Sequence, residues 1–409
     1  MKFGIDRLIA EPSLRAPLKG RRVALLGHPA SVTKDLTHAL DALAACADIK
    51  ISAAFGPQHG LRGEKQDNMI ESPDFNDPVH GIPVFSLYGQ VRKPTDVMMD
   101  AFDVILIDLQ DLGCRIYTFI TTLRYVLEAA SQHHKVVWVL DRPNPVGRPV
   151  EGLKLQAGWE SFVGAGPLPM RHGLTLGELG LWFINTLKLD VEYRVIEMQD
   201  WQPGAAPGFG WPLGARTWVN PSPNAPNLWM ARAYAGTVML EGTTLSEGRG
   251  TTRPLEQFGA PDINARAVMK QMEVIAPQWL DGCRLRECWF EPTFHKHVGK
   301  LCHGMQIHTE GTGYAHCMFK PWRIQALAFK AIRRLYPDYP LWRDFAYEYE
   351  HGKLPIDVIN GGPLLRQWVD DASATPQDLD VLALPDEQTW SSERQRHMRY
   401  GRPQHADNS

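Results

Sequence analysis

Residues 55–72 hold the densest group of chemically active side chains in the sequence. The segment follows an apolar run, and Gly56, Gly60 and Gly63 allow its backbone to turn sharply or to approach a ligand closely. Groups for proton transfer and hydrogen bonding lie between and after these glycines: Gln58, His59, Arg62, Glu64, Lys65 and Glu71. This pattern predicts an active-site loop, although a solvated surface loop would also be rich in such residues.

Further carboxylates lie in other polar loops of the chain. Hydrolysis of a glycosidic bond needs a protonated group beside the leaving oxygen, together with a carboxylate, an activated water or a substrate amide on the other face. The acidic candidates are Glu64, Glu71, Asp108, Asp111, Asp141, Glu241 and Glu247. Each of them, taken singly, is also explained as a helix cap or a partner in a salt bridge, so the pair that does the chemistry stays open.

Arginines share these loops, at positions 62, 115, 142, 249 and 253. A guanidinium binds a carboxylate through two parallel hydrogen bonds, so the arginines indicate an anionic substrate; their alternative role is to pair with the neighbouring acids. The predicted substrate-binding residues are His59, Arg62, Asp108, Gln110, Asp111, Arg115, Tyr117, Asp141, Arg142, Asn144, Glu241, Glu247 and Arg249. Tyr117 could offer its ring to a sugar or could serve as a packing residue.

The elements that must position these residues are predicted strands. Apolar, β-branched runs occur at 22–26, 49–55, 104–107 and 136–140, separated by segments with helical periodicity. This rhythm is typical of a parallel α/β sheet, in which ligands bind outside the carboxyl ends of the strands. The polar loops follow all four runs, yet none reads GxGxxG or GxxxxGK[ST], so no backbone cradle for a nucleotide phosphate is predicted.

Helices are predicted from apolar stripes and from start signals. The stripes are Leu36, Leu40 and Leu43, then Phe119, Leu123, Val126, Leu127 and Ala130; the start signals are the capping-box pair Thr175 and Glu178, and Pro321.

The chain is divided by a change in composition at about residues 202–227, which are rich in proline, glycine and tryptophan. We expect an α/β domain over 1–225 that carries the predicted active-site loops, a smaller α+β domain over 226–385, and a polar tail over 386–409 that frays.

Composition excludes several classes of protein. The 409 residues carry a net charge of −3, which offers no broad attraction for nucleic acid or for an anionic membrane. We expect neither partner. The six cysteines form no CxxC pair, and the N-terminus shows no apolar leader, so a cytoplasmic protein is predicted. Its oligomeric state stays open.

Two rival chemistries have weaker patterns. The stretch that contains His295, His297, Cys302, His303, His308, His316 and Cys317 has no HExxH motif and no paired CxxC, so zinc is not expected. Cys114 lies next to Arg115, but no GxSxG motif for a nucleophile occurs.

A series of motifs resembles one family over residues 21–363. They read Gly-His-Pro-Ala-Ser-Val at 27–32, Phe-Gly-Pro-Gln-His-Gly-Leu-Arg-Gly at 55–63, Ile-Pro-Val-Phe-Ser-Leu-Tyr-Gly at 82–89, Asp-Leu-Gln-Asp-Leu-Gly-Cys-Arg-Ile-Tyr-Thr at 108–118, Leu-Asp-Arg-Pro-Asn-Pro at 140–145, Glu-Gly at 151–152, Arg-His-Gly-Leu-Thr at 171–175, and Glu-Gly-Thr-Thr-Leu-Ser-Glu-Gly-Arg-Gly-Thr-Thr at 241–252. In this order they resemble the NamZ-type exo-β-N-acetylmuramidases.

The resemblance implies a Rossmann-like domain joined to a smaller C-terminal domain, with the active site in the cleft between them. It also implies a hydrolase of cell-wall recycling, which releases N-acetylmuramic acid (MurNAc) from the non-reducing end of peptidoglycan fragments such as MurNAc-GlcNAc. The lactyl carboxylate of that sugar would account for the arginines. No metal and no other cofactor is implied.

The sequence departs from the family pattern at Gln58, where the resemblance implies a catalytic glutamate. An amide can neither donate a carboxylic proton nor act as a base. Either Glu64 or Glu71 supplies the acid, or Gln58 orients the substrate N-acetyl group for internal attack. The alternative hypothesis is a muropeptide-binding or sensing protein that has the same fold and altered catalysis.

Overall fold

The computed structural model describes residues 1–63, 65 and 69–401. Its larger sheet has seven strands in the order β3-β4-β2-β1-β5-β6-β7, and all neighbours pair in parallel except β3 and β4. The strands are β1 (Arg22–Leu26), β2 (Lys50–Gly56), β3 (Phe75–Asn76), β4 (Pro83–Ser86), β5 (Val104–Ile107), β6 (Val136–Leu140) and β7 (Tyr193–Ile196). The prediction of a mostly parallel α/β sheet is confirmed.

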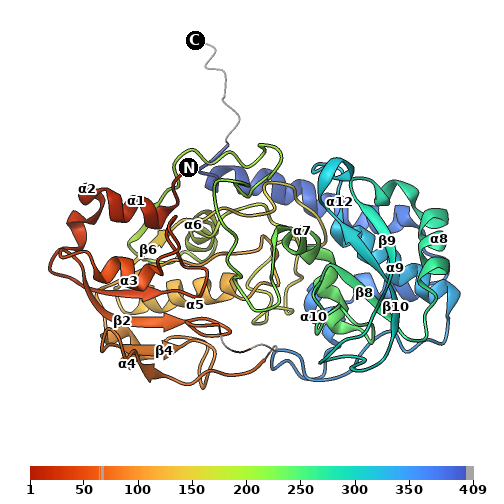
Figure 1. Cartoon of the computed structure of the whole chain (residues 1–409), viewed down its shortest axis with the longest axis horizontal. Helices are drawn as coiled ribbons and strands as arrows, with labels where there is room; N and C mark the ends of the chain where they lie inside the picture. The colour runs from red at the N-terminus through yellow and green to blue at the C-terminus, as the bar shows by residue number, and fades with distance from the viewer. Residues whose placement is uncertain (64, 66–68, 402–409) are drawn as a thin grey trace, which may run out of the picture.

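Helices cover both faces of this sheet (Figure 1). Alternate residues of a strand point to opposite faces, so Val23 and Leu25 pack with α1 and α3, whereas Ala24 and Leu26 pack with α4, α5 and α6. The helices of this half are α1 (Gly4–Ala10), α2 (Pro12–Arg15), α3 (Ala39–Ala44), α4 (Asp96–Asp100), α5 (Phe119–Gln132) and α6 (Leu176–Leu187).

Two of the predicted helix features in this half are tested directly. The capping box of Thr175 and Glu178 forms at the start of α6, as predicted. Leu36, predicted on the helical stripe before α3, lies outside the helix with a φ of 64° and its side chain exposed. That part of the prediction is wrong, because a left-handed residue cannot continue the periodicity of a right-handed helix.

The second half is smaller and contains a three-stranded antiparallel sheet, with the order β8-β10-β9. Its strands are β8 (Gln257–Ala260), β9 (Arg284–Phe290) and β10 (Cys302–His308), and its helices are α7 (Leu228–Thr237), α8 (Ala265–Ile275), α9 (Pro321–Leu335), α10 (Pro355–Asn360), α11 (Leu364–Asp370) and α12 (Pro376–Glu393). Pro321 is the first residue of α9, as predicted. The smaller α+β second part of the fold is thus confirmed, whereas the boundary at residues 225–226 stays a prediction.

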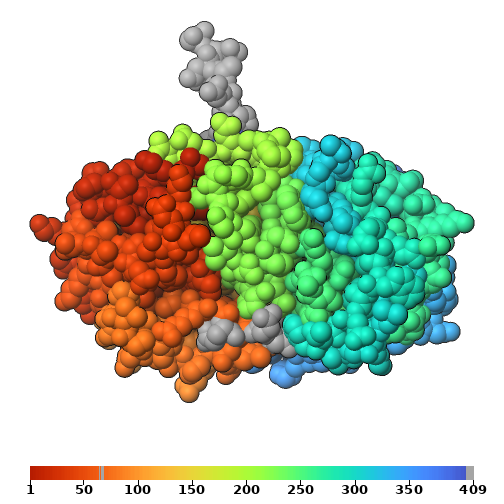
Figure 2. Space-filling model, viewed as in Figure 1, coloured from red at the N-terminus to blue at the C-terminus, as the bar shows by residue number. Residues whose placement is uncertain are grey.

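A segment without regular helix or strand joins the two halves. Residues 202–227 run over the surface between them, where Figure 2 shows yellow-green side chains between the orange and cyan parts of the chain. The proline-rich composition that predicted this crossing also explains it, because proline lacks the N–H that a helix interior or a central strand needs.

The prediction that the chain frays from residue 386 is wrong for the described residues. Helix α12 continues to Glu393 and the short 3-10 helix η5 (Arg394–His397) follows it. Trp390 is fully buried, and its indole Nε1 donates a hydrogen bond of 2.8 Å to the carbonyl of His172. The segment is mostly polar in sequence, so its composition did not indicate the few aromatic residues that anchor it.

Candidate functional site

A polar cavity of about 40 Å³ lies where the loops after β2 and β5 meet segments of the second half. Gln58 and His59 come from the loop after β2, and Thr118 precedes the first turn of α5. The second half contributes Glu241, which lies on the 3-10 helix η2 (Val238–Gly242), and Arg249. The remaining lining residues are Ile116, Tyr117, Val163, Ser222, Asn224, Met230, Tyr234, Leu255 and Tyr347.

A buried charge network forms one wall of the cavity. The Arg249 guanidinium donates to Glu241 Oε1 at 2.6 Å and to Glu247 Oε1 at 3.2 Å, and Tyr347 Oη donates to Glu241 Oε2 at 2.6 Å. The Lys296 ammonium lies 2.9 Å from Glu247 Oε2. Burial alone would raise the pKa of Glu247, but Lys296 and the other neighbouring cations outweigh it and hold that pKa well below its usual range. Arg249 therefore lies between two carboxylates, which offset its charge at the wall of the cavity.

Gln58 connects the cavity to a carboxyl group that the sequence did not indicate. Its Oε1 accepts a hydrogen bond of 2.8 Å from Thr118 Oγ1, which leaves Nε2 to donate to Glu348 Oε1 at 3.3 Å. Tyr88 Oη donates to the other oxygen of Glu348 at 2.9 Å. Burial raises the pKa of Glu348 to about 7, with the charge of Glu241 acting in the same direction.

The backbone at Glu348 adopts a conformation that is unfavourable for its residue type. Tyr347 and Glu350 exchange two backbone hydrogen bonds, and the two residues between them have positive φ, 46° at Glu348 and 68° at Tyr349. Two-residue turns with positive φ at both positions favour asparagine and glycine, and each side chain held there costs about 1–3 kcal/mol. Contacts of the turn compensate: Tyr349 Oη donates to Glu71 Oε1 at 3.0 Å, and Arg92 stacks over the Tyr349 ring at 3.8 Å.

The predicted residues of the loop at 55–72 separate into three groups. Gln58 and His59 line the cavity, where His59 has a φ of 70° and its Nδ1 lies 2.8 Å from the carbonyl of Lys65. Glu71 and Arg62 lie at the surface, paired with Arg92 and Asp77, each at 3.2 Å. Glu64, predicted as an acid, lies outside the described residues. The catalytic roles of Glu64 and Glu71 stay predictions.

Several predicted substrate-binding residues are buried in the protein instead of lining the cavity. Asp108 and Arg142 form a two-pronged pair with distances of 2.6 and 2.9 Å. The Arg115 guanidinium is fully buried and donates to the carbonyls of Leu153, Leu168 and Ile359. These side chains follow the strands as predicted, but their hydrogen bonds stabilise the fold.

Gln110 and Asp111, on the loop after β5, are equally buried. The Gln110 amide donates to the carbonyls of Asp111 and Pro143, at 2.9 and 2.8 Å. Asp111 Oδ2 accepts from the backbone N–H of Gly113 at 2.6 Å. Both residues therefore shape the loop that holds Tyr117 and Thr118 at the cavity.

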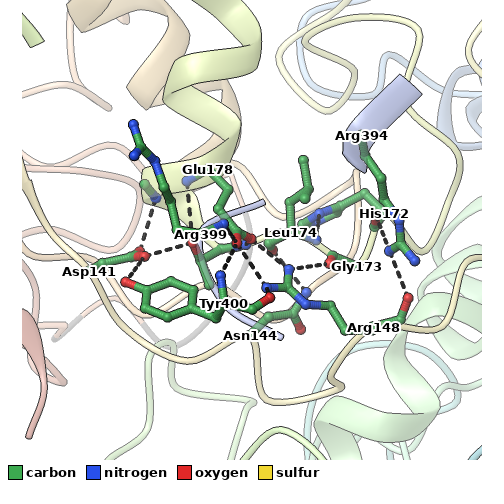
Figure 3. Close-up of polar contacts among 12 residues, drawn as sticks. Asp141, Asn144, Arg148, His172, Gly173, Leu174, Glu178, Arg394, Arg399 and Tyr400 are labelled. Atoms are coloured by element: carbon green, nitrogen blue, oxygen red, sulfur yellow. Dashed lines mark hydrogen bonds and ion pairs between the residues drawn. The ribbon is translucent and has the colours of Figure 1, made fainter. Parts of the chain in front are cut away.

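Asp141 and Asn144 hold the C-terminal segment and the loop after β6 in place (Figure 3). Asp141 Oδ2 accepts hydrogen bonds from Tyr400 Oη at 2.8 Å and from Thr175 Oγ1 at 2.7 Å, and the Asn144 amide donates to the carbonyl of Leu174 at 2.9 Å. Burial raises the pKa of Asp141 to about 7. Their predicted role in substrate binding is not supported, because their polar atoms are used in this docking.

The His- and Cys-rich stretch does not assemble a metal site. Within residues 1–63, 65 and 69–401, no three His, Cys, Asp or Glu side chains are grouped so that they could hold a metal ion. In the same part of the chain, no helix combines the length and the apolar character that crossing a membrane requires.

Glu348 and Tyr347 are the principal residues that sequence reasoning missed. Glu348 is 290 residues from Gln58 along the chain, in a run of alternating tyrosine and glutamate at 347–350 that resembles an ordinary half-exposed segment. Only the tight turn and its contact with Gln58 distinguish it.

Glu348→Gln is expected to stabilise the protein increasingly as the pH rises. The folded-state pKa of about 7 exceeds the ordinary value of 4.5, so ionisation is disfavoured in the folded state. The free energy of unfolding of wild type therefore falls by about 3 kcal/mol as the pH rises from 4.5 to above 7, where the carboxyl is ionised in the folded protein. Urea unfolding of both proteins at pH 4.5 and pH 8 measures this difference, and a pH-independent difference would contradict it.

Comparison with known proteins places the whole fold in a known group. Two family models match, described as exo-beta-N-acetylmuramidase NamZ, N-terminal, over residues 23–229, and C-terminal, over residues 232–400. The chain is 38% identical over 339 residues to the peptidoglycan beta-N-acetylmuramidase NamZ of Bacillus subtilis (strain 168), covering 83% of this chain and 78% of that protein.

Two solved structures from Bacteroides fragilis NCTC 9343, both of DUF1343 family proteins, share the fold. One superposes with a TM-score of 0.85 at 27% identity, and the other with a TM-score of 0.74 at 24% identity. Each match covers 98% of this chain and 99% of the solved chain.

Proposed function

Because the chain belongs to the exo-β-N-acetylmuramidase NamZ family, we propose that it is a glycoside hydrolase that releases MurNAc from the non-reducing end of peptidoglycan fragments of the MurNAc-GlcNAc type. The observation that carries the proposal is the cavity at Gln58. Residues of both halves meet there, since Gln58 and Thr118 come from the first, and Glu241, Arg249 and Tyr347 from the second.

The chemistry of the cavity supports this reaction. A glycosidase stabilises positive charge that develops on the sugar ring, and buried carboxylates such as Glu241 can provide this stabilisation. MurNAc carries a lactyl carboxylate, and the guanidinium groups of Arg92 and Arg124 line a larger cavity that Glu348 also borders. No step in this proposal uses a metal or a cofactor.

We further propose that the protein acts in the cytoplasm, in cell-wall recycling. All six cysteines are free thiols in the structure, which favours a reducing compartment. Cell fractionation with an antibody against the chain tests this location, and recovery of the protein outside the cytoplasm would contradict it.

The activity is tested by incubation with MurNAc-GlcNAc and with an aryl MurNAc glycoside. We expect free MurNAc from both, quantified by chromatography. A folded sample that releases none from either substrate would refute the proposal.

The binding hypothesis raised by Gln58 predicts a different outcome. Calorimetry would then show saturable binding of MurNAc without product, and Gln58→Glu would gain turnover. Membership of an enzyme family does not favour this alternative. The calorimetry and the turnover of Gln58→Glu distinguish the binding hypothesis from the hydrolase proposal.

A further inference from the structure

Gln58 stands where the family resemblance implies a catalytic glutamate, and its amide cannot donate a carboxylic proton. The structure contains a carboxyl group beside it. Glu348 Oε1 lies 3.3 Å from Gln58 Nε2, and the Glu348 side chain is buried. We infer that Glu348 is the carboxylic acid that protonates the leaving glycosidic oxygen in this protein. This inference rests on the proposed hydrolase function.

Glu348 lines one cavity and contacts Gln58, which lines another. Besides the cavity of about 40 Å³ at Gln58, a second cavity of about 330 Å³ is lined by Glu348. Residues adjacent in the chain line different cavities: Tyr347 and Val163 line the first, and Glu348 and Phe162 line the second. The contact between Gln58 and Glu348 is therefore part of the partition between the cavities.

The two cavities differ in size. Pockets that hold small-molecule ligands have volumes of about 300–1,000 Å³, which the second cavity reaches and the first does not. A sugar ring in the second cavity would lie beside Glu348 and Tyr125, which both line it. The same cavity is lined by Arg92 and Arg124, whose charges suit an anionic sugar.

The Glu348 carboxyl group is surrounded by groups that act on its ionisation in opposite directions. Tyr88 and Gln58 donate hydrogen bonds to it from the first half, and Arg92 lies near it; these groups favour the ionised form. Burial and the negative charge of Glu241 on η2 favour the protonated form and outweigh them, so the pKa lies near neutrality. A general acid works best when its pKa is close to the working pH. Lys93, Glu160 and Glu350 complete the charged lining of the cavity.

Glu348 donates its proton to the glycosidic oxygen while the bond from C1 to that oxygen breaks, and the bonding electron pair stays on the oxygen. The carboxylate that remains regains a proton from the water that adds to C1, so the acid is restored after each turnover.

The test compares wild type, Glu348→Gln and the control Asp344→Asn, which changes an exposed carboxylate on the same loop. A nitrophenolate leaves without a proton, whereas the GlcNAc oxygen needs one. We expect Glu348→Gln to lose about 10²-fold or more in kcat on MurNAc-GlcNAc and far less on the nitrophenyl MurNAc glycoside, and Asp344→Asn to resemble wild type. Equal losses on both substrates, or no loss, would overturn the inference.

The pH profile gives a second readout that a structural role would not affect. Wild type should lose activity on MurNAc-GlcNAc at alkaline pH, because Glu348 is then ionised. The same alkaline decrease in activity should be weak for the nitrophenyl glycoside and absent in Glu348→Gln. If the variant does not fold, the test is the comparison of the wild-type pH profiles on the two substrates. Two profiles of identical shape would overturn the inference. Wild type that cleaves neither substrate refutes the proposed function and this inference together, whereas active wild type with an unimpaired variant refutes only the inference.

Discussion

Replacement of Arg249 with methionine is expected to lower the free energy of unfolding by about 3–5 kcal/mol. The guanidinium lies 2.6 Å from Glu241 and 3.2 Å from Glu247, and both carboxylates are buried. Methionine fills a similar volume but supplies no charge, so the two acids would remain in a low-dielectric wall with reduced compensation. Urea denaturation monitored by tryptophan fluorescence measures the loss.

The matched control for this prediction is Arg266→Met. Arg266 forms an ion pair with Glu287 of similar length, 2.7 Å, but the arginine side chain is 80% exposed. Solvent screens such a pair, so the unfolding midpoint should stay close to that of wild type. Similar losses in both variants would show that burial of the Arg249 network contributes little.

Replacement of Arg148 with methionine is expected to cost about 3–5 kcal/mol, at the other side of the molecule. The two nitrogens of its guanidinium lie 2.6 and 2.8 Å from the fully buried Glu178 carboxylate, and one also donates to the carbonyl of Tyr400 at 2.7 Å (Figure 3). Without Arg148, Glu178 keeps the backbone donors of Thr175 and Arg399 but loses its counter-charge.

The same variant tests how the C-terminal segment is held. Because Arg148 joins Glu178 to Tyr400, its loss should also raise proteolytic sensitivity after residue 393, which limited proteolysis measures. Arg399→Met is the control, since Arg399 is half exposed and lies 3.8 Å from Glu197. An Arg148→Met protein as stable and as resistant as this control would contradict the prediction.

The sequence alone was sufficient to predict the framework of this protein. The strands observed at Arg22–Leu26, Val104–Ile107 and Val136–Leu140 have the predicted bounds, and β2 differs by one residue at each end. Their apolar runs are local patterns, and a parallel sheet buried on both faces requires such patterns directly in the sequence. The family motifs are equally local, so fold and family could be recognised without coordinates.

Prediction of the site was only partly possible from the sequence, because proximity to a strand end does not tell where a side chain points. Asp108, Arg115 and Arg142 follow strands as predicted, yet they satisfy buried partners within the protein. Gln58, Glu241 and Arg249 do meet at one cavity. Which polar groups face a cavity depends on long-range packing, which periodicity along the chain does not record.

The sequence therefore predicted where the loop at 55–72 lies, at the carboxyl end of a strand. Which groups can react beside this loop depends on the tertiary structure. The sequence shows the glycines of this loop and the amide of Gln58, where the family resemblance implies an acid. The carboxyl group beside that amide comes from a strained turn at Glu348, 290 residues later, and only the packing of the second half against the first brings them within 3.3 Å. Burial at that contact, absent from the unfolded chain, gives the carboxyl group its raised pKa.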